Sequence, residues 1–105
     1  MRMLTALSLA LGLAVGATSA QSRANLDIYL IDMEGGNATL FVAPSGESVL
    51  IDTGNGGAAA ARDADRIMAA AKEAGLKQID HLITTHWHGD HFGAMAELVK
   101  RIPIR

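Results

Sequence analysis

A cluster of histidine and aspartate residues near the end of the chain is the feature that most constrains its fold. Residues 85–93 read Thr-His-Trp-His-Gly-Asp-His-Phe-Gly and contain three of the four histidines in the 105-residue sequence. Such a combination arises by chance in roughly 4 of 10,000 chains of this composition, so a metal site is the preferred interpretation. The four candidate ligands fall within six residues and are His86, His88, Asp90 and His91.

The spacing of these four side chains arranges them in two pairs. A short apolar run, residues 82–85, precedes the cluster. Because alternate side chains of an extended segment lie on the same side, His86 and His88 can share one metal ion. Asp90 and His91 fall at the expected turn into a helix, where the chain doubles back. A second metal ion can bind there, close to the first.

The types of ligand narrow the choice of metal. The chain contains no cysteine, which excludes thiolate ligands, disulfides and cysteine nucleophiles within it. Imidazole and carboxylate ligands suit zinc, with iron or manganese as alternatives. A loop of surface histidines without function is the competing interpretation, but it would require neither Asp90 nor the flanking glycines. The fourth histidine, His81, stands alone at the start of a strand and is expected to be structural.

The first twenty residues have the pattern of a secretory signal peptide. Arg2 precedes an apolar run from Leu4 to Val15, and small residues occupy positions 17–20. A helix that crosses a bilayer needs about 20 apolar residues, and this run is shorter. We therefore expect residues 1–20 to be cleaved and the mature chain to begin near Gln21. The mature protein would then be secreted or periplasmic, with no membrane anchor.

Four strands are expected in the remaining sequence. Alternating apolar residues predict a strand within residues 26–31, and β-prone runs follow at 39–42 and 48–51. These three strands are expected to be antiparallel and joined by tight turns, the first of them at Gly-Gly-Asn. Residues 82–85 are short and apolar, as is typical of a buried strand.

Two helices are expected between and after these strands. The alanine-rich segment 58–74 predicts a helix with Ile67, Ala71 and Ala74 on one face, ended by Gly75. A second helix is expected to begin near His91 and to end before Pro103, because the residue before a proline disfavours helical geometry. The residues expected on its inner side are Met95, Leu98, Val99 and Ile102.

The order of elements indicates a mixed class, α/β or α+β. Four short strands and two helices would leave at least one face of the sheet uncovered. We therefore interpret residues 21–105 as a partial domain, the amino-terminal fragment of a larger one that is truncated at its carboxyl end.

Three segments together resemble the metallo-β-lactamase superfamily. The His-x-His-x-Asp-His pattern follows a strand that ends Leu-Ile-Thr-Thr, and Leu50-Ile51-Asp52-Thr53-Gly54 is similar to the superfamily's Asp-x-Gly turn. Residues 31–40 and 77–82 resemble the branch that contains the hydrolase domain of the DNA-uptake competence proteins. The resemblance covers about residues 26–104.

This resemblance implies a fold and a set of roles. The fold would be the amino-terminal half of an αββα sandwich, with two metal ions at one edge of its sheets. His86 and His88 would bind the first metal, Asp90 and His91 the second, and Asp52 would brace the metal-binding loop. The superfamily also uses a third histidine, a bridging aspartate and a last histidine, which would follow Arg105.

These expectations lead to a metal-dependent hydrolase that carries two zinc ions and uses a metal-bound hydroxide. Asp90 is the expected catalytic residue, because it can orient the hydroxide and relay its proton. The expected substrates are small esters, amides or phosphoesters. The net charge of −2 and the absence of a basic stripe do not indicate a nucleic-acid surface. The alternative is a non-catalytic secreted metal-binding module of the same fold, and the fragment alone is expected to be inactive.

Overall fold

One mixed β-sheet organises the chain. The computed structural model describes residues 23–105, so the expected signal peptide lies outside the described residues. The sheet has the strand order β1-β2-β3-β4. Strands β1, β2 and β3 are antiparallel, and β4 is parallel to β3. The strands are β1 (Asp27–Leu30), β2 (Thr39–Val42), β3 (Ser48–Ile51) and β4 (His81–Ile83).

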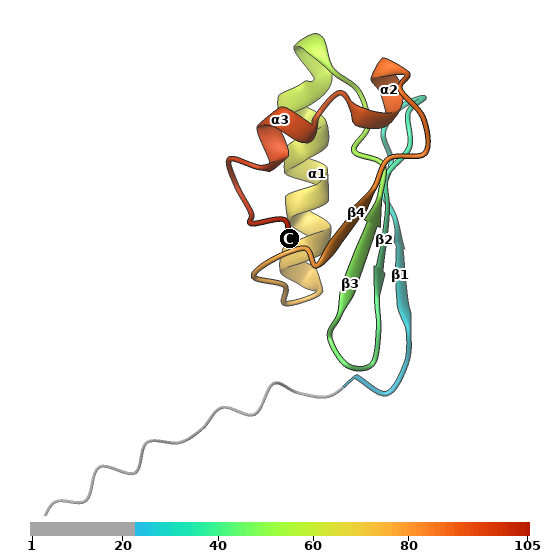
Figure 1. Ribbon diagram of the computed structural model, residues 1–105, viewed down its shortest axis with the longest axis vertical. Coiled ribbons are helices and arrows are strands. Elements are labelled where there is room, and N and C mark those ends of the chain that lie inside the picture. The colour runs from blue at the N-terminus through green and yellow to red at the C-terminus, as the bar shows by residue number, and fades with distance from the viewer. Residues whose placement is uncertain (1–22) are drawn as a thin grey trace, which may run out of the picture.

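The helices lie on one face and at one end of this sheet. In the described part of the chain they are η1, a 3-10 helix (Gly57–Ala59), α1 (Ala60–Glu73), α2 (Gly89–Phe92) and α3 (Met95–Leu98). Helix α1 runs along the sheet with α3 beside it, and α2 lies near the end of the sheet that β4 approaches (Figure 1). No helix within residues 23–105 is long and apolar enough to cross a membrane.

The hydrophobic core lies between α1 and the inner face of the sheet. Leu40 of β2 pairs with Leu50 of β3, and both side chains are fully buried. Ile67, Ala71 and Ala74 are buried opposite them, which confirms the inner face predicted for the first helix. Burial of a leucine or isoleucine side chain contributes about 1.5–3 kcal/mol, so this layer is the main source of cohesion.

The opposite face of the sheet is apolar and open within residues 23–105. Ile28, Leu30 and Ile83 lie on it, with exposed fractions of 54, 83 and 49%. The register places half-buried Phe41 and Ile51 on the same face. One sheet with helices on a single face is consistent with part of the αββα sandwich that the resemblance implies, and it confirms the mixed class.

The single helix expected from His91 to the residue before Pro103 is wrong. The segment forms two short helices, α2 and α3, which are interrupted at Gly93 because its backbone N–H donates to the carbonyl of Gly54 at 3.0 Å. Val99, expected on the inner side, is 52% exposed and follows the last residue of α3. Leu98 is buried as expected.

Two expectations about the strands are also wrong. The fourth strand is present, but β4 is not buried and ends at Ile83, and the backbone N–H of Thr85 donates to Asp52 after the end of β3. The connection between β1 and β2 is not a tight turn but a loop over residues 31–38. Glu34 and Gly35 adopt left-handed conformations there, with φ of 52° and 107°. This loop extends past the sheet and reaches the histidine cluster.

Candidate metal centre

The structure brings the three histidine rings of the cluster together. His86 and His88 belong to the segment between β4 and α2, and His91 belongs to α2. Helix α2 lies at one end of the sheet (Figure 1). The ring centre of His86 is 4.7 Å from that of His88 and 3.9 Å from that of His91. His88 is extended and directly precedes α2, so the chain turns between the two pairs of predicted ligands.

Asp90, the predicted catalytic residue, lies beside His91, the other member of its predicted pair of ligands. Both residues belong to α2, and Oδ2 of Asp90 is 3.6 Å from Nε2 of His91. The Asp90 side chain is 42% exposed, whereas that of His91 is 21% exposed. The carboxylate is therefore accessible from solvent and close to a ring nitrogen that can bind a metal.

Asp52 is a buried carboxylate behind this pair. Its Oδ2 accepts hydrogen bonds from Nδ1 of His91 at 2.7 Å, from Oγ1 of Thr85 at 2.8 Å and from Nδ2 of Asn37 at 3.0 Å. Its Oδ1 accepts a fourth, from the backbone N–H of Thr85 at 2.8 Å. Because Nδ1 of His91 donates to Asp52, the lone pair of that ring is on Nε2, as a metal ligand requires.

The electrostatic state of Asp52 follows from these contacts. Burial raises the pKa of Asp52, but the hydrogen bonds from Thr85, His91 and Asn37 outweigh burial and lower it to about 2. The carboxylate is therefore charged at neutral pH. Its φ of 63° lies in the left-handed region, which aspartate tolerates better than most residues. Asp52 thus braces the turn that carries the predicted ligands from behind, which is the position that the resemblance implies for it.

Close contacts between backbone segments also hold this turn. The backbone N–H of Thr53 donates to the carbonyl of His91 at 2.8 Å. A Cβ atom added at Gly36 would collide with the carbonyl oxygen of Asp90, and one at Gly93 would collide with the backbone of Gly56. Side chains cannot be accommodated at either position unless the turn moves.

The donor set fits zinc, which accepts imidazole and carboxylate ligands. Nδ1 of His86 lies 3.0 Å from Oγ1 of Thr85, so its Nε2 is also left for a ligand role. Within residues 23–105 no three His, Asp or Glu side chains are grouped so that they could hold one ion. Two protein ligands per metal, as the resemblance implies, would leave coordination positions for donors outside this group.

Two residues near the ligands were not identified from the sequence. Asn37 was interpreted as part of a hairpin connection and Thr85 as part of a strand, but both donate to Asp52. An asparagine after two glycines is typical of a turn, and a threonine at the end of an apolar run is typical of a strand. Only their hydrogen bonds to Asp52 distinguish Asn37 and Thr85 from ordinary turn and strand residues. The local sequence does not show these bonds, because Asp52 is distant along the chain.

His81 lies away from the cluster, as expected for a structural residue. It is at the start of β4, where Nε2 is 2.8 Å from Oε1 of Glu47, and its side chain is 56% exposed. No contact joins it to the other histidines.

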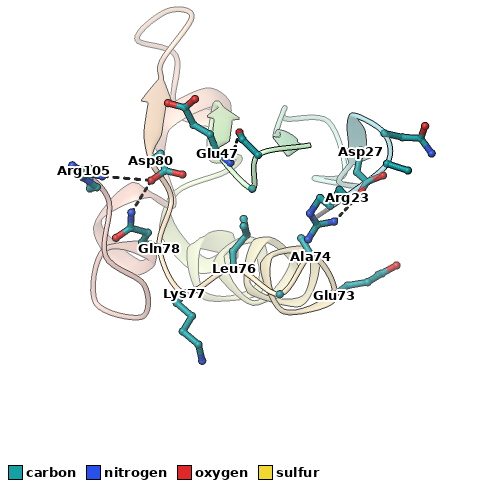
Figure 2. A pocket seen from close by; sticks show the side chains of 15 residues that line it. Arg23, Asp27, Glu47, Glu73, Ala74, Leu76, Lys77, Gln78, Asp80 and Arg105 are labelled. Atoms are coloured by element: carbon teal, nitrogen blue, oxygen red, sulfur yellow. Dashed lines mark hydrogen bonds and ion pairs between the residues drawn. The ribbon is translucent and has the colours of Figure 1, made fainter. Parts of the chain in front are cut away.

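A polar hollow of about 1210 Å³ lies at the opposite end of the sheet, and none of the predicted ligands lines it (Figure 2). Some of its charged side chains are paired with their neighbours. Arg23 and Asp27 form an ion pair at 2.5 Å, and Asp80 accepts a hydrogen bond from Gln78 at 2.6 Å. Because the predicted ligands lie at the other end of the sheet, we place the candidate site at the histidines.

Comparison with known families shows the superfamily to which the chain belongs. A sequence model of the metallo-β-lactamase superfamily matches residues 31–105. The chain belongs to the metallo-β-lactamase superfamily. This match confirms the resemblance drawn from the histidine motif and the Asp-x-Gly turn, while the branch within the superfamily stays a prediction. No solved structure matches the chain significantly.

Curated relatives of this metallo-β-lactamase chain include fungal and bacterial proteins. It is 39% identical over 70 residues to the lactamase-like protein adaB of Aspergillus niger, covering 65% of this chain and 20% of that protein. It is 32% identical over 68 residues to an atrochrysone carboxyl ACP thioesterase of Aspergillus terreus, with the same coverage. It is 36% identical over 69 residues to a UPF0173 metal-dependent hydrolase of Staphylococcus saprophyticus, covering 63% and 25%. The chain thus spans about a fifth to a quarter of these relatives.

Proposed function

We propose that the protein containing this chain is a secreted or periplasmic hydrolase that uses two zinc ions to cleave a small ester, thioester, amide or phosphoester. One observation carries the proposal. The ring of His91 is held by the buried Asp52 carboxylate within a group of three imidazoles and beside Asp90. A histidine oriented by a carboxylate is the usual arrangement behind a catalytic metal ion.

Each residue of the cluster has a distinct role in this proposal. His86 and His88 hold the first metal, and Asp90 and His91 hold the second. When bound, the metals supply Lewis acidity and lower the pKa of a coordinated water toward neutrality. Asp90 orients the attacking water and takes up its proton, because its carboxylate is accessible from solvent and close to Nε2 of His91.

The relatives guide the choice of the first substrates. An atrochrysone carboxyl ACP thioesterase and a metal-dependent hydrolase are among them. A thioester carbonyl and an ester carbonyl present the same reacting centre to a water nucleophile. We therefore place acyl esters and thioesters before phosphoesters in the order of testing.

The test uses the full-length protein, purified with and without zinc. Metal content is measured by mass spectrometry, and hydrolysis is assayed with ester, thioester, lactam and phosphodiester substrates. The proposal predicts about two metals per complete domain and hydrolysis that a chelator abolishes and zinc restores. Two bound metals without hydrolysis of any substrate would support the non-catalytic metal-binding module instead. Absence of metal would contradict both.

A further inference from the structure

The loop between β1 and β2 reaches the metal-binding turn through one side chain. We propose that Asn37 is a positioning residue for the Asp90 and His91 pair, because it fixes the Asp52 carboxylate and the turn that carries Asp90 relative to each other. This inference rests on the proposed function, since it gives Asn37 a role at the same site.

Asn37 makes three hydrogen bonds to two separate segments. Its side-chain Nδ2 donates to Oδ2 of Asp52 at 3.0 Å, and its backbone N–H donates to the carbonyl of Asp90 at 3.1 Å. Its own carbonyl accepts a hydrogen bond from the N–H of Gly54 at 2.9 Å. Asn37 therefore connects the Asp-x-Gly turn after β3 to the first turn of α2.

The loop that carries Asn37 is itself anchored to α1 and the preceding turn. The carboxylate of Glu34 pairs with Arg62 at 2.5 Å and with Arg66 at 2.6 Å. The carbonyl of Met33 accepts a hydrogen bond from Nδ2 of Asn55 at 2.5 Å. With its preceding residues held in this way, Asn37 can impose a position on Asp52 instead of following it.

The chemistry of the Asn37 side chain suits this role. Oδ2 of Asp52 receives His91, Thr85 and Asn37 as donors, and an amide adds a donor without adding charge. Removal of that donor takes away one of the four hydrogen bonds that fix the carboxylate, so the acceptor of the His91 ring is held less firmly. Neither His86 nor His88 receives a hydrogen bond from Asn37, so the effect should be confined to the second pair of ligands.

Metal titration of the full-length protein tests the proposal. Metal-free wild type, Asn37→Ala and Asn37→Asp are titrated with Co²⁺ and followed by visible absorption, with exposed Asn25→Ala as the matched control. We expect Asn37→Ala to weaken one of two sites by about 10-fold or more and to leave the other within about twofold. Asn37→Asp keeps the size but loses the donor, so we expect at least the same loss.

Several outcomes would overturn the proposal where the wild type binds two metals. Unchanged affinity in Asn37→Ala would do so, as would equal weakening of both sites, which indicates a general loss of structure. Wild-type affinity in Asn37→Asp would show that packing, and not hydrogen-bond donation, is what the site requires.

A measurement without metal separates this proposal from the proposed function. The backbone N–H of Thr85 donates to Oδ1 of Asp52, so its hydrogen exchange reports how firmly the carboxylate is held. We expect faster exchange at Thr85 in metal-free Asn37→Ala, with the amide of Leu50 in the sheet unchanged. If the wild type binds no metal, and the Thr85 amide exchanges faster in Asn37→Ala than in wild type, the proposed function fails and the positioning role stands. Unchanged exchange at Thr85 overturns the positioning role.

Discussion

Nδ1 of His91 lies 2.7 Å from Oδ2 of Asp52, and this hydrogen bond joins the end of β3 to the first turn of α2. The two residues are separated by 39 positions in the sequence. A carboxylate behind a metal-binding histidine fixes the orientation of the ring and increases its basicity. If the proposed metal centre is correct, its affinity for metal therefore depends on a residue that is not itself a proposed ligand.

Replacement of Asp52 tests this dependence. Asp52→Asn in the full-length protein keeps the size of the side chain but leaves too few acceptor positions for its donors. Second-sphere changes of this kind lower metal affinity about 10- to 100-fold. Competition with a zinc-binding dye should show that loss, together with an intact cooperative unfolding transition. Wild-type zinc affinity in Asp52→Asn would contradict the bracing role.

Replacement of Asp90 separates metal binding from catalysis. Under the proposed function, Asp90→Ala in the full-length protein removes a ligand of the second metal and also the group that orients the attacking water. We therefore expect turnover to fall more than the total metal content, measured by mass spectrometry on the same sample. The control is His81→Ala, which should change neither quantity because His81 contacts Glu47 away from the cluster. Full turnover with both metals in Asp90→Ala would show that the site assignment is wrong.

The local pattern predicted the clustering of the histidines better than it predicted the surroundings of the cluster. The histidine motif places His86, His88 and His91 within a few residues, so chain connectivity alone brings the rings close together. Asn37 and Thr85 act through contacts with Asp52 that span many residues of sequence. Periodicity and turn preferences describe neighbours along the chain, and they carry no information about such distant pairs.

The restriction of sequence patterns to neighbouring residues also explains which parts of the fold were predicted correctly. Helix α1 was predicted well, because a long alanine-rich segment with a buried face at Ile67 and Ala71 shows a clear period. The continuous helix after His91 was wrong because Gly93 bonds to Gly54, a residue far away in the sequence. The conformation of a short segment depends on tertiary contacts of this kind more than on the residues of the segment itself.

A buried hydroxyl next to Asp52 gives a prediction about stability. Oγ1 of Thr53 is buried and has no hydrogen-bond partner within the described part of the chain. Valine has the same shape without the hydroxyl, so Thr53→Val removes a polar group that costs desolvation. We expect the free energy of unfolding to stay within about 1 kcal/mol of wild type or to rise. Urea denaturation of the full-length protein measures it, and a marked loss of stability would mean that the hydroxyl has a partner outside these residues.

The signal-peptide pattern predicts the amino terminus of the exported protein. Arg2, the apolar run and the small residues at 17–20 motivate it, although they lie outside the described residues. Mass spectrometry of material from the periplasm or medium should find a new terminus near Gln21. Soluble protein that retains Met1 in the cytoplasm would contradict the proposed location.

Asp63 should make the stability of the domain depend on pH. Burial raises its pKa, but hydrogen bonds from Arg62 and Asn55 outweigh burial and the pKa is lowered. The side chain is fully buried, and its Oδ2 accepts from the backbone N–H of Asn55 at 2.7 Å. Because the pKa is lower in the folded state than the unfolded value of about 3.9, the ionised carboxylate stabilises the fold above about pH 4. That contribution is lost as the pH falls through the folded-state pKa.

Asp63→Asn tests the sign of this linkage. The amide keeps the size of the side chain but cannot pair with Arg62, so we expect the free energy of unfolding to fall by about 1.5–3 kcal/mol at pH 7. The difference from wild type should shrink below about pH 4, where the unfolded wild-type chain takes up a proton that the folded carboxylate resists. Asp65→Asn is the control on the same helix, because Asp65 is 71% exposed and its loss should matter little. Urea denaturation of the full-length proteins from pH 7 to pH 3 measures both variants. A difference between Asp63→Asn and wild type that grows as the pH falls would reverse the sign and show that Asp63 is not held as a stabilising carboxylate.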